Sequence, residues 1–230
     1  MLIKPKKRMI VIIISLIIFA IAITLLVLNL NNKSMTYEEK VAAFELENPT
    51  LKKGQIVFLG DSITARYKLG HSYSDLSLEV YNRGISGDTA DWIIARMKVS
   101  VLDIEPSKVV LMIGTNDING GKGADEIAQD YDNILGLLAS NLPDTEVICV
   151  SIIPQNTKFS ENAAQNNLRI KQTNEKIREL AREYGYEYVN LYDELTDTDG
   201  LLRRSYSADG LHLGRKGYEV WTRVMKPFLE

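Results

Sequence analysis

The sequence predicts an α/β protein, a three-layer α/β/α sandwich around a parallel five-stranded sheet, preceded by one N-terminal transmembrane helix. Two observations predict the sandwich: short apolar runs follow one another along the chain, and longer amphipathic stretches separate them. The uncharged run of residues 9–30 predicts the transmembrane helix. A chain of 230 residues has room for one domain of ordinary size and such an appendage.

The N-terminus divides into a basic start, residues 1–8, and the uncharged segment, residues 9–30. As a helix this segment would extend about 33 Å, which crosses the hydrocarbon of a bilayer and satisfies its own backbone there. The positive residues before it predict a cytoplasmic N-terminus and an extracellular C-terminal part, and therefore a single-pass signal anchor in the cell membrane. A cleavable signal peptide is the alternative, but residues 28–32 lack a small-x-small cleavage site.

After the anchor, residues 31–53 are polar and include a short helix-like piece, residues 37–46, so we expect a linker or stalk before a domain of residues 54–230. Within that domain, nearly continuous apolar runs are typical of strands covered on both faces. These runs are residues 56–59, 80–81, 109–113, 147–150 and 188–189. Apolar residues at helical spacing predict helices over residues 124–138 and 170–184, and a terminal helix is expected over about residues 215–228.

The charge of the chain argues against a nucleic-acid partner. Lys and Arg number 27 and Asp and Glu number 30, which gives a net charge of −3. Residues 1–34 hold five of the positive charges and no acidic residue, so the remainder has 22 positive and 30 negative charges, a net −8. Such a surface does not attract nucleic acid. The only cysteine, Cys149, lies in an apolar run, where we expect a buried thiol and no internal disulfide.

Four short polar blocks interrupt the apolar pattern, and three of them lie at the ends of expected strands. They are residues 60–64 (Gly-Asp-Ser-Ile-Thr), 82–87 (Asn-Arg-Gly-Ile-Ser-Gly), 114–117 (Gly-Thr-Asn-Asp) and 209–212 (Asp-Gly-Leu-His). In open parallel sheets, ligand sites collect beyond the carboxyl ends of the strands. The blocks are therefore expected to meet at one edge of the sheet.

Within these blocks, Ser62 stands at an expected strand-to-helix turn, where a serine could serve as a helix cap or as a nucleophile. A nucleophilic serine needs a base, and the chain has only two histidines, His71 and His212. His212 follows Asp209 by three residues across a glycine, so a tight turn can bring the carboxylate to Nδ1 and leave Nε2 facing Ser62. His71 has no acidic neighbour before Asp75, and we expect it in a solvated loop.

Taken together and in this order, the four blocks resemble those of the SGNH hydrolases, also called the GDSL esterase/lipase family, from about Gln55 to the C-terminus. The resemblance implies a flavodoxin-like fold, a Ser62–His212–Asp209 triad, an acyl-enzyme and no cofactor or metal. It also implies an oxyanion hole formed by the backbone N–H groups of Ser62 and Gly87 and the side-chain amide of Asn116. The serine is not in a Gly-x-Ser-x-Gly motif, which separates the chain from the α/β-hydrolases.

The resemblance implies an ester as substrate, and the block of residues 82–89 is similar to the subgroup of platelet-activating-factor-type acetylhydrolases and bacterial carbohydrate acetylesterases. We therefore expect a small acyl group, on an acetylated glycan or a lipid of the cell envelope; the choice between these and the oligomeric state stay open. Two other hypotheses remain. One is a metal-dependent, phosphoesterase-type hydrolase with Asp61, Asp117 and His212 as ligands, although the usual metal-ligand spacings are missing. The other is a non-catalytic surface binding module.

Overall fold

The structure is a computed structural model that describes residue 19 and residues 35–230. The chain divides into two compact units, Met1–Glu38 and Glu39–Glu230. The expected basic start, residues 1–8, and the expected anchor, residues 9–30, lie outside the described residues except for Phe19. Among the described residues, none of the helices combines the length and the apolar character needed to span a bilayer.

At the centre of the second unit lies a parallel five-stranded sheet in the order β2-β1-β3-β4-β5. The strands are β1 (Ile56–Gly60), β2 (Val80–Gly84), β3 (Lys108–Met112), β4 (Glu146–Val150) and β5 (Glu187–Val189). The expected parallel sheet is confirmed. The order reverses between β1 and β3, and this switch point is where open α/β sheets bind ligands.

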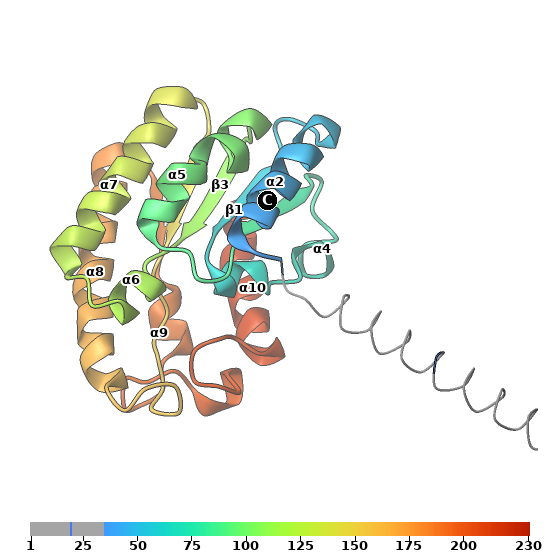
Figure 1. Cartoon of the computed structure of the whole chain (residues 1–230). Coiled ribbons are helices and arrows are strands. Elements are labelled where there is room, and N and C mark those ends of the chain that lie inside the picture. The colour runs from blue at the N-terminus through green and yellow to red at the C-terminus, as the bar shows by residue number, and fades with distance from the viewer. Residues whose placement is uncertain (1–18, 20–34) are drawn as a thin grey trace, which may run out of the picture. The chain divides into compact units, whose positions relative to one another are not determined.

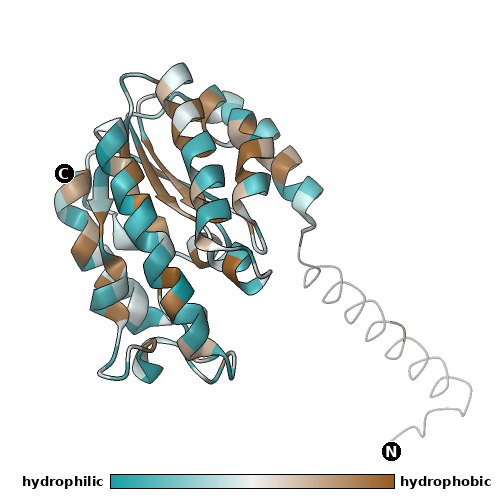
Figure 2. Ribbon diagram, turned by 90° about the vertical axis from the view of Figure 1, so that its left-hand side faces the viewer, coloured by the Kyte–Doolittle hydropathy of each residue, from teal (hydrophilic) through white to brown (hydrophobic). Residues whose placement is uncertain are grey.

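Helices cover both faces of the sheet, which confirms the three-layer arrangement (Figure 1). Along β1, Val57 and Leu59 point to one face and Ile56 and Phe58 to the other, as the two-residue period of a strand requires. The first face packs against α5 (Ala90–Ser100), α7 (Ala124–Asn141) and α8 (Ala163–Tyr184). The second packs against α3 (Ser62–Ala65), α4 (Leu69–Ser72), α9 (Leu191–Leu195) and α10 (Arg215–Leu229). Figure 2 shows the apolar strands between helices whose outward sides are hydrophilic.

The remaining short elements are α6 (Thr115–Asn119) and the 3₁₀ turns η1 (Asn48–Thr50), η2 (Leu102–Ile104) and η3 (Arg204–Tyr206). Helix α8 starts well before the expected residue 170. Its first turns present buried asparagines in place of apolar residues: Asn167 accepts a hydrogen bond from the backbone N–H of Gln155 at 2.8 Å. A polar contact with a loop therefore extends a helix that an apolar pattern alone does not detect.

Strand β2 is longer than the expected residues 80–81, because polar residues within it find partners. The Asn82 side-chain amide donates to the backbone carbonyls of Thr64 and Tyr67 at 2.8 and 3.1 Å. Arg83, whose side chain is 1% exposed, pairs with Glu47 at 2.6 Å. The second polar block, residues 82–87, therefore begins inside β2, and the strand ends within the block at Gly84.

The partner of Arg83 belongs to α2 (Tyr37–Glu47), which lies in the expected linker of residues 31–53. The ring of Phe44 is buried, with the guanidinium carbon of Arg83 4.3 Å from its centroid. Next to this helix, the side chain of Asn48 donates to the Val99 carbonyl at 2.8 Å. From Glu39 on, the expected linker belongs to the second compact unit. The polar sequence of α2 does not reveal this packing, because the helix packs mainly against the buried, charged side chain of Arg83.

Candidate active site

Ser62 is the first residue of α3 and directly follows the end of β1 at the sheet edge. Asp61 caps this short helix by accepting a hydrogen bond from the backbone N–H of Ile63 at 2.8 Å. The helix packs closely on the sheet because Gly84 has no side chain: a Cβ there would lie 2.3 Å from the Ala65 nitrogen. Ser62 is thereby held at a fixed point, with 8% of its surface exposed.

His212 and Asp209 complete a continuous hydrogen-bonded series with Ser62. The Ser62 Oγ lies 2.9 Å from the His212 Nε2, and the His212 Nδ1 lies 2.8 Å from the Asp209 Oδ2. Ser62 and His212 are 150 residues apart in the chain. The structure thus brings together the three residues that the sequence analysis singled out. With the ring proton on Nδ1, bonded to Asp209, the Nε2 lone pair is free to accept the proton of the serine.

The turn from Asp209 to His212 sets the orientation of the imidazole. Asp209 Oδ1 accepts hydrogen bonds from the backbone N–H groups of Leu211 at 3.0 Å and His212 at 2.8 Å, and Gly210 adopts a φ of +86°. Partial burial by itself would raise the pKa of Asp209, but the hydrogen bonds from the His212 ring and these two backbone groups outweigh it and hold the pKa well below its ordinary value. The carboxylate is therefore ionised at neutral pH.

Gly87 and Asn116 lie next to each other at the same edge of the sheet. The N–H of Asp88 donates to the Ile85 carbonyl at 3.3 Å, and between them Gly87 adopts a φ of +88°, the conformation of the third residue of a type II turn. The Asn116 side-chain amide donates to the Asp88 carbonyl at 2.7 Å. This amide has two N–H groups, and the bond to Asp88 uses one of them.

A buried ion pair between Asp88 and Arg96 supports this turn. Arg96 of α5 approaches Asp88 to 2.6 Å and also donates to the Gly60 carbonyl at 3.1 Å, so it ties the Gly87 turn to the end of β1. Burial raises the pKa of Asp88 to about 6, although Arg96 opposes the shift. The sequence analysis missed both residues. A signal existed, because Arg96 lies on α5 between the buried Ile93 and Met97, at a position that faces the interior.

Asp61 and Asp117, the carboxylates proposed as metal ligands together with His212, have other contacts. The Oδ1 of Asp61 caps α3, and its Oδ2 is buried without a hydrogen-bond partner among the described residues. Burial raises the pKa of Asp61 to about 7, against the hydrogen bond from Ile63 and with help from the nearby charges of Asp88 and Asp117. Asp117 accepts from the Ala90 N–H at 3.2 Å and pairs with Lys122 at 3.0 Å.

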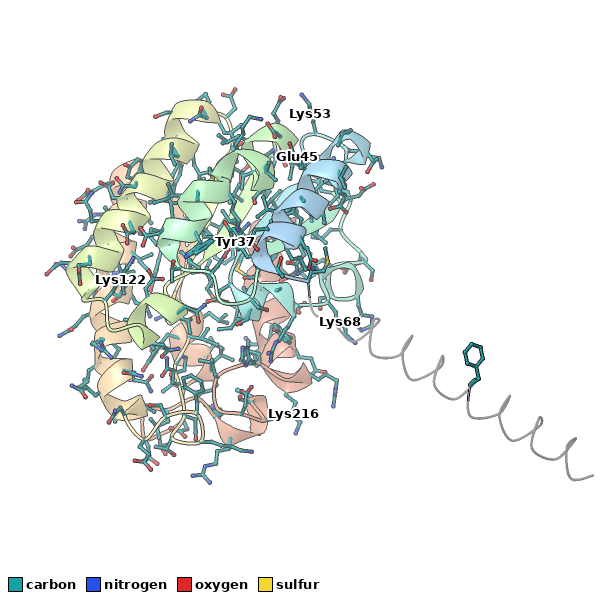
Figure 3. All side chains as sticks on the ribbon, viewed as in Figure 1. Tyr37, Glu45, Lys53, Lys68, Lys122 and Lys216 are labelled. Atoms are coloured by element: carbon teal, nitrogen blue, oxygen red, sulfur yellow. The ribbon has the colours of Figure 1, made fainter. Side chains whose placement is uncertain are left out.

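Lys122, labelled in Figure 3 at the loop between α6 and α7, connects three carboxylates. Its ammonium lies 2.5 Å from Asp91, 3.0 Å from Asp117 and 2.8 Å from Asp130. Within the part of the chain that the structure describes, these three aspartates are the group whose carboxylate oxygens approach within 4.8 Å of one another, as metal ligands would. The group includes neither Asp61 nor His212, so the ligand set that the sequence analysis considered is not formed.

Comparison with known proteins identifies similar sequences. The model of the GDSL-like lipase/acylhydrolase family matches residues 58–220. The platelet-activating factor acetylhydrolase IB subunit alpha2 of Homo sapiens is 30% identical over 189 residues, which cover 78% of this chain and 76% of the relative. The isoamyl acetate-hydrolyzing esterase 1 homolog of Homo sapiens is 26% identical over 204 residues, 76% of this chain and 81% of the relative.

Solved structures are similar over the same region. A Streptococcus pneumonia protein whose name refers to platelet activating factor has a TM-score of 0.79 and 30% identity, and the match covers 92% of this chain and 99% of that one. A GDSL-like lipase from Bacteroides thetaiotaomicron has a TM-score of 0.73 at 23% identity, with 82% and 96% covered. At 23% identity, the similarity to the Bacteroides thetaiotaomicron protein shows a shared fold alone.

Proposed function

The chain belongs to the GDSL-like lipase/acylhydrolase family and is an acylhydrolase, and from this premise we propose that it is a serine esterase that removes small acyl groups. The observation that carries the proposal is the hydrogen-bonded series from the Ser62 hydroxyl through the His212 ring to the Asp209 carboxylate. In this series Ser62 is the nucleophile, His212 the general base and Asp209 the group that orients the imidazole.

In the first half of the reaction, the His212 Nε2 accepts the proton of the Ser62 hydroxyl while Oγ forms a bond to the carbonyl carbon of the ester. The carbonyl oxygen becomes an oxyanion. When the intermediate collapses, the C–O bond to the alcohol breaks, and His212 returns its proton to the departing oxygen. The products of this half-reaction are a free alcohol and an acyl group on Ser62.

In the second half, water takes the place of the alcohol. His212 accepts a proton from the water as its oxygen attacks the acyl carbon, and then returns the proton to the Ser62 Oγ as the acyl bond breaks. The carboxylic acid leaves and the serine hydroxyl is restored. Ionised Asp209 stabilises the positive imidazolium that exists in both halves.

The oxyanion of each intermediate would be bound by the backbone N–H groups of Ser62 and Gly87 and by the second N–H of the Asn116 amide. The turn at Gly87 and the bond from Asn116 to the Asp88 carbonyl support this assignment, because they fix the two donors before substrate arrives. One such donor contributes about 3 kcal/mol to transition-state stabilisation.

For the substrate, we propose a short acyl ester of an acetylated glycan or a lipid at the cell envelope. The names of the two human relatives, an acetylhydrolase and an isoamyl acetate-hydrolyzing esterase, support a short acyl group. The uncharged run of residues 9–30 supports an anchor that keeps the domain outside the cell membrane. The full chain should therefore remain with the membrane fraction after alkaline carbonate washing, and a chain that begins at residue 35 should not.

A fluorophosphonate probe tests the proposed chemistry on the full chain. The probe should form a covalent bond to Ser62, identified by peptide mass spectrometry. Ser62→Ala should lose labelling entirely, and His212→Ala should be labelled at least 100-fold more slowly, since the serine then has no base, by the order of magnitude of general-base catalysis. Ser140→Ala, an exposed serine of α7, is the matched control and should be labelled like the wild type. Labelling of Ser62→Ala at the wild-type rate would refute the assignment.

A further inference from the structure

A groove of about 800 Å³ opens between the segment that joins α3 to α4 and the first turns of α10. Its charged and titratable lining is predominantly basic: Arg66, Lys68, His71, Arg215 and Arg223 face a single acidic residue, Glu219. Lys68 and Lys216, labelled in Figure 3, mark the two elements that border it. His71 lines this groove at the end of α4, whereas the sequence analysis expected it in a solvated loop.

The positive charge of the groove contrasts with the rest of the domain. Residues 35–230 carry 22 positive and 30 negative charges, a net −8, yet the groove has four Arg and Lys side chains and one carboxylate. Arg215 is paired with Glu219, and Arg223 with Glu194. Arg66 and Lys68, on the other side of the groove, are less closely paired. Among the described residues, the one ion pair of Arg66 is a 4.0 Å contact with Asp209, and Lys68 has no ion pair.

Ser62 and His212 do not line the groove themselves, but residues that follow each of them closely in the chain do. Arg66 follows Ser62 by four residues, which places both side chains on one face of the helical turn, and its backbone N–H donates to the Ser62 carbonyl at 3.1 Å. On the other side, Leu213 and Arg215 follow His212 directly in the chain. A substrate whose acyl carbon lies at Ser62 can therefore extend its alcohol part into this groove.

Two stacked tyrosines form part of the wall of the groove. The rings of Tyr67 and Tyr218 stack with their centroids 4.6 Å apart, and both tyrosines line the groove. The Tyr218 hydroxyl donates to the Ile63 carbonyl at 2.6 Å, which ties α10 to the helix that carries Ser62. Arg66 and Lys68 therefore flank a residue, Tyr67, that packs against α10.

Building on the proposed esterase function, we propose that this groove binds a negatively charged group on the alcohol part of the substrate, either a phosphate or a carboxylate. Arginine and lysine are the side chains that recognise such groups, and Arg66 can do so with two parallel hydrogen bonds. The favoured substrates are then acyl esters of anionic alcohols, such as a phosphate-bearing glycerol or an acidic sugar.

Three acetyl esters built on one three-carbon skeleton test this subsite: neutral 1-acetylglycerol, 1-acetylglycerol 3-phosphate and 3-O-acetylglycerate. For the full chain at low salt, we expect kcat/KM for at least one charged ester to exceed that of the neutral ester about tenfold, the effect of one close charge pair near a protein surface. The two charged esters distinguish the sources, since a preference for one identifies the group that the groove recognises. In 1 M NaCl, where the screening length is about 3 Å, the ratio should fall toward one.

The double variant Arg66→Gln, Lys68→Gln should reduce the ratio of kcat/KM between the charged and the neutral ester to about one. Labelling of Ser62 by the fluorophosphonate probe in this variant checks that the site is still formed. The matched control is Lys98→Gln, an exposed lysine of α5 on the other face of the sheet, which should keep the wild-type ratio.

Two results separate failure of the subsite from failure of the proposed function. A wild-type chain that hydrolyses the neutral ester as fast as both charged esters at low salt would overturn the anion subsite and leave the esterase intact. The same holds if the double variant retains the wild-type ratio. A chain that hydrolyses none of the three esters and is not labelled at Ser62 would overturn the proposed function, and the subsite with it.

Discussion

Asp61, one residue before Ser62, combines a structural role with an unsatisfied atom. One of its carboxylate oxygens caps α3, and the other is buried without a hydrogen-bond partner among the described residues. Its surroundings include two further buried carboxylates, Asp88 and Asp117, while the nearby Arg96 pairs with Asp88. Burial and these neighbours raise its pKa to about 7, so near neutral pH the carboxyl holds a proton in part of the molecules.

This shift makes folding stability depend on pH. Because the folded-state pKa of about 7 exceeds the ordinary 3.8, the folded protein retains a proton between about pH 4 and 7 that the unfolded chain has lost. The stability contributed by Asp61 is therefore full below about pH 4 and declines as the pH rises to about 7. In Asp61→Asn this part of the decline should vanish, a difference of roughly 4 kcal/mol in the free energy of unfolding between pH 4 and 7.5.

Urea unfolding across this pH range measures the effect. Asp144→Asn, a substitution at an exposed aspartate, provides the comparison and should follow the wild-type slope. If Asp61→Asn also follows that slope, the folded-state carboxyl of Asp61 is ionised throughout and the argument fails.

At the scale of elements, one lysine joins three helical segments. Lys122 contacts Asp91 of α5, Asp117 of α6 and Asp130 of α7. Burial would lower the pKa of Lys122, but the three carboxylates raise it above its ordinary value. The contact with Asp117 matters most, because that carboxylate is 1% exposed and lies one residue from Asn116. The lysine thus compensates a buried charge next to the proposed oxyanion donor.

Removing the cation should destabilise the fold. We expect Lys122→Met to lower the free energy of unfolding by about 1–3 kcal/mol at pH 7, less than for a fully buried pair because 29% of the Lys122 side chain is exposed. The loss should shrink toward pH 4, since burial raises the pKa of Asp117 and a protonated Asp117 no longer needs a cation.

The control for this change is Lys176→Met on α8, which removes an exposed ion pair with Asp125 of α7. This substitution should lower the free energy of unfolding by less than about 1 kcal/mol. Chemical denaturation of both variants gives the comparison. Equal losses in the two variants would mean that Lys122 acts as an ordinary surface lysine.

At the scale of the whole molecule, the second compact unit starts at Glu39, before its first strand. Helix α2 supplies Glu47 to Arg83, whose side chain is 1% exposed, and Phe44 covers the same guanidinium. Without α2, a buried charge on the edge strand β2 would lose its carboxylate and its aromatic neighbour. Breaking a fully buried pair costs about 3 kcal/mol or more; the half-exposed Glu47 lowers that cost here, and the loss of the buried Phe44 ring adds to it.

Two chain lengths test this boundary. A chain that begins at residue 54 should unfold about 10 °C below one that begins at residue 35, given roughly 2–4 °C per kcal/mol for a domain of this size. Adding Arg83→Met to the shorter chain should recover part of the loss, because the uncompensated charge is then gone. Equal thermal midpoints for the two chains would restore the view that residues 35–53 are only a linker.

The sequence by itself determined the parallel sheet and the residues of the candidate site. Strands covered on both faces are continuous apolar runs, and the polar blocks that follow them are short. The strands and the site residues can therefore be recognised from short stretches of sequence. The pairing of Asp209 with His212 is equally local, because one turn closes it. Ser62 and His212 are far apart in the chain, but with only two histidines the choice of base was narrow.

Only the tertiary structure decided which charged residues are buried and what they contact. Arg83, Arg96, Asp61 and Asp117 are charged residues of types that usually lie at the surface, and only Arg96, between the apolar Ile93 and Met97 on α5, has a sign of burial in its own segment. Their partners come from elements up to 36 residues away, as with Glu47 for Arg83 and the Gly60 carbonyl for Arg96. A charged side chain is buried only where packing brings partners to it from other segments, so its own segment seldom predicts its burial. An apolar run, in contrast, predicts burial from its own residues.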